Sequence, residues 1–256
     1  MILEVLPTRS GGAAENMAVD FLMLQRYPHA GGPRFRHYGW RAPAFTFGYA
    51  QRIAFVREQL PAGETFDLCR RPTGGGIVDH RDDWTYALVI PRGHPLEELR
   101  AAQSYRAVHE ALAEALQALG VDAFTKRTAA EPGESAVGVD APPIPKSLSS
   151  PEAAVQEGVC FQRAEVYDVV NSRTGEKVAG AAQKRNKHGL LFQGSIWRRA
   201  AGGAVVDWDQ FEENFVGRLA AALGAEAAPT PWPEFNEDEV SGLTDQYSIR
   251  EWIEYR

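Results

Sequence analysis

Three consecutive glycines follow two arginines at the end of an apolar segment. The run consists of Arg70, Arg71, Pro72, Thr73, Gly74, Gly75 and Gly76. Glycines permit positive φ and let a ligand approach the main chain closely, while guanidinium groups and a hydroxyl can donate to a carboxylate or a phosphate. The spacing matches neither a P-loop nor a dinucleotide-binding loop. The run therefore predicts either a site for an anionic ligand or a tight turn with two solvated arginines.

A cysteine and a lysine offer a second kind of chemistry. Cys160 begins a Cys-Phe pair, and Lys177 lies further along the chain. A thiolate becomes a nucleophile when nearby positive charge favours it, and Lys177 would supply that charge if the two segments are neighbours. Gly180 and Gly194 would leave backbone groups open to a ligand. The alternatives are a small buried cysteine and a solvated lysine, and Cys69 is interpreted as the buried kind.

Helices and strands must position these residues. Apolar residues at helical spacing predict helices over 15–27, 96–119 and 208–223, and a short one over 248–255. Apolar and alternating runs predict strands over 34–40, 44–49, 66–71, 85–90, 159–161, 167–170, 176–179 and 190–192. The second of these strands is expected to pair with the first. Because no βαβ rhythm is present, we expect an antiparallel or mixed sheet with helices packed against it.

The bulk composition bounds the class of protein. The chain has 256 residues, of which 44% are apolar and 24% charged, with a formal net charge of −7. These values are typical of a globular domain, which we assign to residues 1–256, and the acidic balance argues against nucleic-acid binding. No apolar run could span a membrane, and no signal peptide is visible. With two cysteines, a reducing cytoplasm is expected, and no metal-ligand spacing is present.

Several motifs occur in an order that resembles a known superfamily. They are Asn-Met-Ala-Val-Asp at 16–20, two aromatic motifs within 34–51, the glycine run extended to a histidine at 70–80, Thr-Tyr at 85–86, and Lys-Val-Ala-Gly-Ala-Ala-Gln at 177–183. Together they resemble the lipoate protein ligases and octanoyltransferases of the biotin/lipoate protein ligase superfamily. The resemblance implies an α/β (α+β) fold of the class II synthetase type, with a mainly antiparallel or mixed central sheet, a small second sheet and flanking helices.

The resemblance also implies roles for individual residues. In this family a lysine that matches Lys177 contacts the carbonyl end of the acyl chain. In one group of octanoyltransferases, a cysteine that matches Cys160 takes octanoyl from acyl carrier protein as a thioester and passes it to a lipoyl-domain lysine. Catalytic roles are therefore expected for Cys160 and Lys177, without a cofactor. The residues expected to bind substrate are Arg70, Arg71, Thr73, Gly74, Gly75, Gly76, His80, Ala179, Gly180, Gln183, Gln193, Gly194 and Ser195.

The implied partners are acyl carrier protein and lipoyl domains, namely glycine cleavage H protein or the E2 component of 2-oxoacid dehydrogenases, with no membrane partner. Lipoyl domains are usually acidic, so docking is expected to use a local basic surface. An ordinary solvated charge cluster is the alternative interpretation. The candidates for the basic surface are Lys184, Arg185, Lys187, Arg198 and Arg199.

The chain also departs from the family pattern. Members commonly carry His-Asp where this chain has His80-Arg81, and a histidine where it has Gln193. The amide of Gln193 can form hydrogen bonds but cannot titrate. A longer segment at about 128–157 is predicted to be a mobile insertion that gates the site. Two other functions therefore stay open. One is an ATP-dependent lipoate ligase that uses ATP and Mg through an acyl-adenylate. The other is a diverged homologue that binds acyl groups or lipoyl proteins without turnover.

Overall fold

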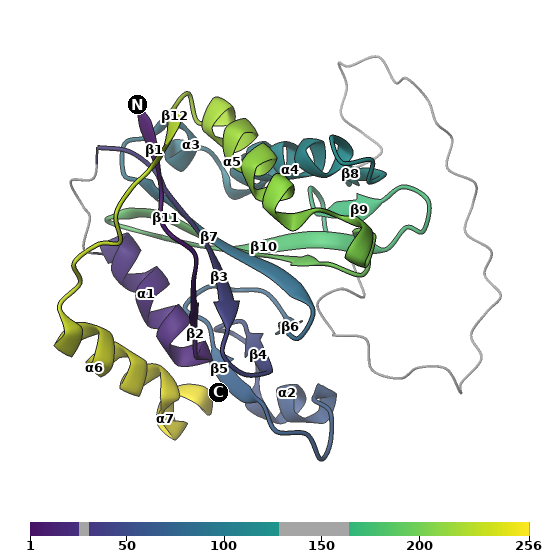
Figure 1. Cartoon of the computed structure of the whole chain (residues 1–256). Coiled ribbons are helices and arrows are strands. Elements are labelled where there is room, and N and C mark those ends of the chain that lie inside the picture. The colour runs from purple at the N-terminus through teal and green to yellow at the C-terminus, as the bar shows by residue number, and fades with distance from the viewer. Residues whose placement is uncertain (26–30, 128–163, 256) are drawn as a thin grey trace.

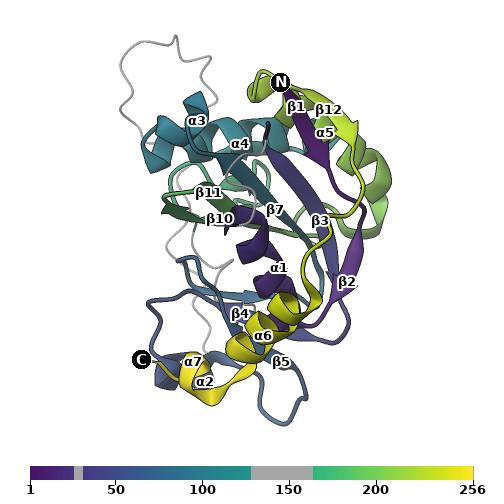
Figure 2. The same ribbon diagram turned by 90° about the vertical axis from the view of Figure 1, so that its left-hand side faces the viewer.

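The computed structural model describes residues 1–25, 31–127 and 164–255 of the chain. The insertion predicted over 128–157, the strand predicted over 159–161 and Cys160 lie outside these ranges. The described residues form two β-sheets with helices packed against them (Figure 1 and Figure 2). This arrangement confirms the predicted α/β (α+β) class, with a mixed central sheet and a small second sheet.

The larger sheet has nine strands within the described part of the chain. In spatial order they are β12 (Glu226–Pro229), β1 (Ile2–Val5), β3 (Arg34–Trp40), β7 (Asp83–Pro91), β11 (Gly189–Trp197), β10 (Lys177–Asn186), β9 (Val169–Asn171) and β8 (Ala123–Thr125), with β2 (Arg9–Gly11) also beside β3. The pairs from β3 through to β8 are antiparallel, whereas β1 runs parallel to β3 and to β12. The sheet is therefore mixed, with an antiparallel centre.

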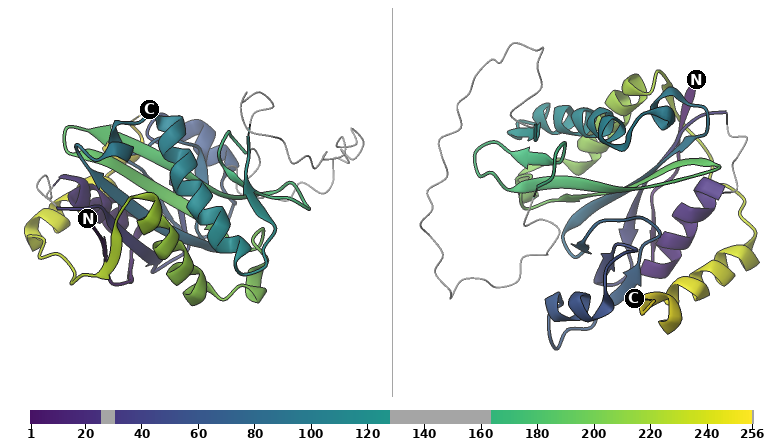
Figure 3. Two further views of the ribbon diagram at one scale, coloured as in Figure 1. Left: turned by 90° about the horizontal axis from the view of Figure 1, so that it is seen from above. Right: turned by 180° about the vertical axis from the view of Figure 1, so that it is seen from behind.

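Helices cover both faces of this sheet. The helices of the described residues are α1 (Ala13–Gln25), α2 (Ile53–Gln59), α3 (Pro95–Glu98), α4 (Ala101–Gln117), α5 (Trp208–Ala222), α6 (Glu237–Ser248) and α7 (Arg250–Ile253), with a 3-10 turn at Gly203–Val205. Helices α4 and α5 lie together on one face (Figure 3). On that face Tyr86 of β7, Phe192 of β11 and Phe215 of α5 are fully buried in the main core. Because strand side chains alternate between faces, Thr85 and Gln193 point the other way, towards α1.

The second face carries α1 and the smaller sheet. The smaller sheet has the order β5 (Asp67–Arg70), β4 (Ala44–Phe47) and β6 (Ile77–Asp79). Helix α6 packs along α1, and α7 contacts β5, so the C-terminal segment closes this side of the molecule (Figure 1). The glycine run connects β5 to β6 and is thereby held between the two sheets.

Two expectations about the elements were wrong. The segment after residue 43 does not pair with β3, because β4 instead pairs with β5 and β6 of the smaller sheet. The helix predicted over 96–119 is broken into α3 and α4, since Leu99 and Arg100 are extended. The guanidinium of Arg185 donates to the carbonyls of Glu97 and Leu99 at this break. A tertiary contact thus occupies carbonyls that a continuous helix would use.

Candidate active site

A cavity of about 400 Å³ lies between the β10–β11 pair, the smaller sheet and the turn before β9. Strands β10 and β11 are paired here. Strand β9 pairs only with the first residues of β10, from Lys177 to Ala179, so the rest of that edge of β10 can face the cavity. The expected site residues that line the cavity are Arg71, Gly75, Gly76, His80, Lys177, Gly180, Gln193, Gly194 and Ser195. The fold therefore brings together residues from the glycine run and from the lysine motif, far apart in sequence.

Of the other expected site residues that the structure describes, none is in the cavity lining. Ala179 is buried in the main core. The amide of Gln183 donates to Ser104 Oγ at 3.0 Å and so ties β10 to α4. The hydroxyl of Thr73 and the carbonyl of Gly74 are bonded to other parts of the protein. These residues support the cavity wall. The sequence had instead suggested that they contact the substrate.

Arg70 differs most from its expected role. Its side chain is fully buried, and its guanidinium donates to four backbone carbonyls, those of Tyr49, Gln51, Trp252 and Ile253. The indole of Trp252 donates in return to the Arg70 carbonyl at 2.9 Å. Arg70 therefore joins α7 to the smaller sheet and does not line the cavity. The adjacent arginines were indistinguishable in the sequence, where both were suited to an anion.

Arg71 organises the glycine run. Its guanidinium donates to Thr46 Oγ1 at 2.8 Å and to the carbonyls of Gly74 and Gly76 at 2.9 Å each. Gly75 has a φ of 89°, which a residue with a side chain rarely adopts. The run therefore bends around a buried cation, with the carbonyls of Gly74 and Gly76 directed at Arg71.

Gln193 links the glycine run to helix α1. Its Oε1 accepts from Thr73 Oγ1 at 2.7 Å, and its Nε2 donates to Asp20 Oδ2 at 2.7 Å. Asp20 is fully buried beside Arg36, at 2.6 Å. Burial raises the pKa of Asp20, and the Arg36 guanidinium opposes that rise. Because both ends of the amide are bonded, Gln193 acts as a fixed bridge here, where family members commonly carry a histidine.

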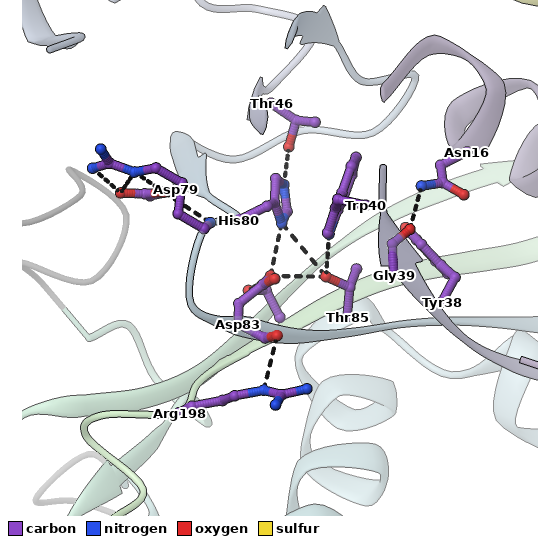
Figure 4. Close-up of polar contacts among 12 residues, drawn as sticks. Asn16, Tyr38, Gly39, Trp40, Thr46, Asp79, His80, Asp83, Thr85 and Arg198 are labelled. Carbon is purple, nitrogen blue, oxygen red and sulfur yellow. Dashed lines mark hydrogen bonds and ion pairs between the residues drawn. The ribbon is translucent and has the colours of Figure 1, made fainter. Parts of the chain in front are cut away.

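His80 lies at the centre of a hydrogen-bond network between the two sheets (Figure 4). Its Nδ1 is 2.7 Å from Asp83 Oδ2 and its Nε2 is 2.7 Å from Thr46 Oγ1. The same Asp83 oxygen accepts from Thr85 Oγ1 at 2.8 Å and from Ser195 Oγ at 2.6 Å. Both ring nitrogens therefore have protein partners, which orients the imidazole and connects β7 and β11 to β4.

Lys177 begins β10 and extends into the cavity wall. Its Nζ lies 2.8 Å from Asp168 Oδ2, and the two side chains are only 13% and 10% exposed. A Cβ on Gly180 would come within 2.7 Å of the Lys177 Cε and Nζ atoms. The glycine thus leaves the space through which the lysine side chain passes. An ammonium held in a cavity wall can stabilise negative charge that develops on a bound carbonyl oxygen.

Some cavity residues were not among the expected site residues. Asp168 was assigned only to a predicted strand, although its side chain pairs with Lys177. Tyr105 of α4 also lines the cavity, and burial raises its pKa to about 12. Thr46 was assigned to a strand without any role. For Asp168 alone the sequence held a signal, namely an acidic residue just before a short apolar run and shortly before a candidate lysine.

Cys69 is the buried thiol expected from the sequence. It is 1% exposed, and burial raises its pKa to about 12. Its Sγ lies 3.7 Å from the carbonyl oxygens of Arg70 and Tyr247. A thiol in this position stays protonated near neutral pH and is a poor nucleophile.

The five basic residues suggested for docking form two groups. Lys184, Arg185 and Lys187 lie at the hairpin end of β10 and β11, whereas Arg198 follows the other end of β11. At the rise of a β-strand these ends are roughly 25 Å apart. Arg198 also lies over the Trp208 ring and donates to the Asp83 carbonyl at 3.1 Å. The residues therefore do not form one continuous surface.

Residues 12–208 match the lipoyl protein ligase A/B catalytic domain family. The chain belongs to this family. The match begins just before α1 and ends as α5 begins, and so includes every residue of the cavity described above.

Relatives in the family carry the name octanoyltransferase LipM. The one from Kyrpidia tusciae is 28% identical over 97% of both chains. The one from Halalkalibacterium halodurans is 32% identical over 72% of this chain and 61% of its own length. The one from Bacillus subtilis is 32% identical over 73% of this chain and 63% of its own. The similarity to the first of these three spans nearly the full length of both chains, and that to the other two spans about three fifths of the relative's length.

Solved structures of lipoate-protein ligases share the fold. Lipoate-protein ligase A bound with ATP has a TM-score of 0.68 and 18% identity, with 99% of both chains covered. The bipartite lipoate protein ligase from Thermoplasma acidophilum has a TM-score of 0.69 and 18% identity, covering 100% of this chain and 98% of that one. These likenesses establish the class II synthetase-type fold that the sequence predicted.

Two kinds of feature are absent from the described residues. No helix there has the length and apolar character needed to cross a membrane. Likewise, no group of three or more histidine, cysteine, aspartate or glutamate side chains in those ranges is arranged to hold a metal ion.

Proposed function

We propose that this chain transfers octanoyl from acyl carrier protein to a lysine of a lipoyl domain, through a thioester on Cys160, as one catalytic domain. The relatives named octanoyltransferase support the reaction class. The Cys-Phe context of Cys160 in the sequence supports the choice of nucleophile. Cys69 is buried with a raised pKa, so it does not compete for this role.

The observation that carries the proposal is the placement of Lys177. Its ammonium lies in the wall of a 400 Å³ cavity whose other lining includes Met17, Val78 and Ala181. Cavities of this size and apolar character suit a small acyl chain. An ammonium in such a wall is suited to a carbonyl oxygen at the end of that chain. The glycines beside it let the acyl group approach the backbone.

The reaction proceeds in two balanced steps. In the first, the Cys160 thiolate attacks the carrier thioester, a new C–S bond forms, and the carrier thiolate leaves and takes up a proton. In the second, the neutral amine of the lipoyl-domain lysine attacks the enzyme thioester, a C–N bond forms, the C–S bond breaks, and the amine proton passes to the cysteine sulfur. Lys177 stabilises the oxyanion in both steps. The donor is already activated, so the route uses no ATP.

Mass spectrometry of intact proteins tests this proposal. The chain is mixed with octanoyl-acyl carrier protein, first alone and then with a lipoyl domain. We expect an octanoyl adduct on the enzyme and then an octanoylated lipoyl domain. Cys160→Ser should abolish both products, whereas Cys69→Ser, the matched control, should keep both. Octanoyl transfer by Cys160→Ser at the rate of the unsubstituted chain would overturn the thioester route.

An ATP-dependent ligase is the second candidate, because the fold matches lipoate-protein ligase A bound with ATP over nearly its whole length. The same experiment is repeated with octanoate, ATP and Mg in place of the carrier. Product that forms only under these conditions, and is unaffected by Cys160→Ser, would favour the ligase. Binding of octanoate without product in either arm would favour a non-catalytic homologue.

A further inference from the structure

Asp168 occupies a position in the cavity that the proposed reaction does not yet use. Its Oδ2 lies 2.8 Å from the Lys177 ammonium and accepts the Glu165 backbone N–H at 2.7 Å. Both Asp168 and Lys177 line the cavity. Both side chains are at most 13% exposed, so salt screens the pair far less than a surface ion pair. The backbone and the lysine thus hold the same carboxylate oxygen of Asp168.

The turn that carries Asp168 is itself held from several directions. Tyr167 has a φ of 68°, a left-handed conformation that is unfavourable for a tyrosine. Its N–H donates to the Lys126 carbonyl at 2.7 Å, and the Lys126 N–H donates to the Asp168 carbonyl at 2.8 Å. His109 Nδ1 of α4 lies 2.7 Å from the Tyr167 carbonyl oxygen. Contacts from α4 and from the end of β8 therefore maintain a conformation that places the aspartate beside Lys177.

A lysine side chain has four rotatable bonds and is rarely ordered without a partner. Asp168 restricts Lys177 to one position, and the missing side chain at Gly180 leaves that position open: a Cβ there would lie 2.7 Å from Lys177 Nζ and 3.0 Å from Asp168 Oδ1. An ammonium has three N–H donors. With one of them directed at Asp168, two remain for a carbonyl oxygen that becomes an oxyanion.

We propose that Asp168 is the positioning residue for Lys177: it holds the ammonium at the point in the cavity where the acyl carbonyl binds. This inference rests on the proposed function, in which Lys177 stabilises the oxyanion. A purely structural aspartate would support the turn before β9 whether or not Lys177 is present. A positioning aspartate acts through Lys177, and its substitution therefore has little further effect once the lysine amine is gone.

A double-mutant cycle on transfer to the lipoyl domain separates these cases. Asp168→Asn keeps the size of the side chain and its acceptor for the Glu165 N–H but removes the charge. We expect it to lower kcat by about 10- to 100-fold, a loss within the range of interaction energies measured between contacting residues. The KM for the lipoyl domain should be nearly unchanged. In the Lys177→Met background the same substitution should change kcat by less than about 2-fold. Asp168→Glu should restore part of the loss.

A matched control and a second measurement complete the test. Asp122→Asn removes the exposed ion pair with Arg173 and should leave kcat unchanged. Lysine-selective ¹⁵N NMR should show a signal from an ordered Lys177 ammonium. The signal is assigned by its absence from the spectrum of Lys177→Met. We expect it to disappear in Asp168→Asn as well.

The outcomes distinguish the two proposals. Equal loss of kcat from Asp168→Asn with and without Lys177, or no change of the ammonium signal, would overturn the positioning role. If the unsubstituted chain forms no product, the proposed function fails. If Lys177→Met transfers at full rate, the oxyanion role of Lys177 fails. In either case the NMR signal still decides whether Asp168 holds Lys177.

Discussion

At the scale of one residue, the amide of Gln193 determines which hydrogen bonds link helix α1 to the glycine run. One end of its amide donates to the Asp20 carboxylate and the other accepts from the Thr73 hydroxyl. A neutral histidine, which family members commonly carry here, has one donor and one acceptor nitrogen and can make the same two bonds. The departure seen in the sequence therefore preserves the link between α1 and the glycine run while removing a titratable group from the cavity.

Replacing Gln193 by glutamate should test this bridge. The change places a second carboxylate against Asp20 in a buried site and removes the donor between them. We expect the free energy of unfolding to fall by about 3 kcal/mol or more near neutral pH, since an unpaired charge is left buried. Gln193→His, the control, should cost less than about 1.5 kcal/mol. Urea denaturation measures both. A loss from the glutamate variant no larger than that from the histidine variant would contradict the bridge.

The sequence predicted part of the site at this scale and could not predict the rest. Lys177, Gly180, Gly75 and Gly76 line one cavity, and their residue types alone indicated a cation and an open backbone beside a ligand. Arg70 and Arg71 could not be told apart, because their tasks depend on which elements pack against them. Asp168 went unassigned, since its function comes from a contact between two segments and not from its own neighbours in the chain.

At the scale of the elements, glycines in paired strands set how closely side chains pass over the sheet. A Cβ at Gly180 would lie 2.7 Å from the end of the flexible Lys177 side chain, whereas one at Gly194 would lie 2.2 Å from the fully buried ring of Tyr86. The Lys177 side chain can move away from an added Cβ, whereas the buried Tyr86 ring cannot. Two glycines at neighbouring positions on β10 and β11 therefore carry different constraints.

Alanine substitutions at these two glycines should separate activity from stability. We expect Gly180→Ala to change the free energy of unfolding by less than about 1 kcal/mol but to reduce transfer to the lipoyl domain at least tenfold, because the Cβ displaces Lys177. Gly194→Ala should lower the free energy of unfolding by about 1–3 kcal/mol or more, because the core is overpacked. Thermal unfolding and the transfer assay are run in parallel on both variants. Full activity of Gly180→Ala would contradict the assigned role of this glycine.

Strand positions were easier to predict than strand partners. The run predicted as a strand at 34–40 coincides with β3, which is buried on both faces, with Phe35 in one core cluster and Tyr38 in another. The adjacent segment was assigned to the same sheet, although β4 belongs to the smaller one. Local patterns do not encode pairing, which depends on residues far away in the chain. Helix α6 was missed for a different reason: Tyr247 is its only buried side chain within the described residues, and the segment carries only a weak apolar pattern at helical spacing.

At the scale of the whole molecule, Arg70 joins the C-terminal segment to the rest of the fold. Four carbonyls from two distant segments converge on its guanidinium. Arg70→Met should lower the free energy of unfolding by roughly 3–5 kcal/mol, because buried carbonyls lose charged donors. It should also expose α7 to proteolysis. Arg70→Lys should be intermediate, since one ammonium cannot reach both segments. A change below about 1 kcal/mol in urea denaturation would show that α7 is held by other contacts.

His109 makes the stability of the whole chain depend on pH. It is 1% exposed, and burial lowers its pKa from the usual value, so the folded chain keeps this imidazole neutral. The unfolded chain binds a proton there below about pH 6.5, and the folded chain does not until a lower pH. Protonation therefore favours unfolding, and this part of the stability is lost as the pH falls below about 6.5, at up to about 1.4 kcal/mol per pH unit.

His109→Gln should remove that contribution while keeping a donor near the Tyr167 carbonyl. Above about pH 7.5, where the imidazole is neutral in both states, the variant should differ from the original chain by a constant amount, which serves as the internal control. Below about pH 6.5 the stability of the variant should fall less steeply with decreasing pH. Urea denaturation at several pH values measures both slopes. Parallel slopes over the acidic range would mean that His109 takes up a proton in the folded chain as readily as in the unfolded one.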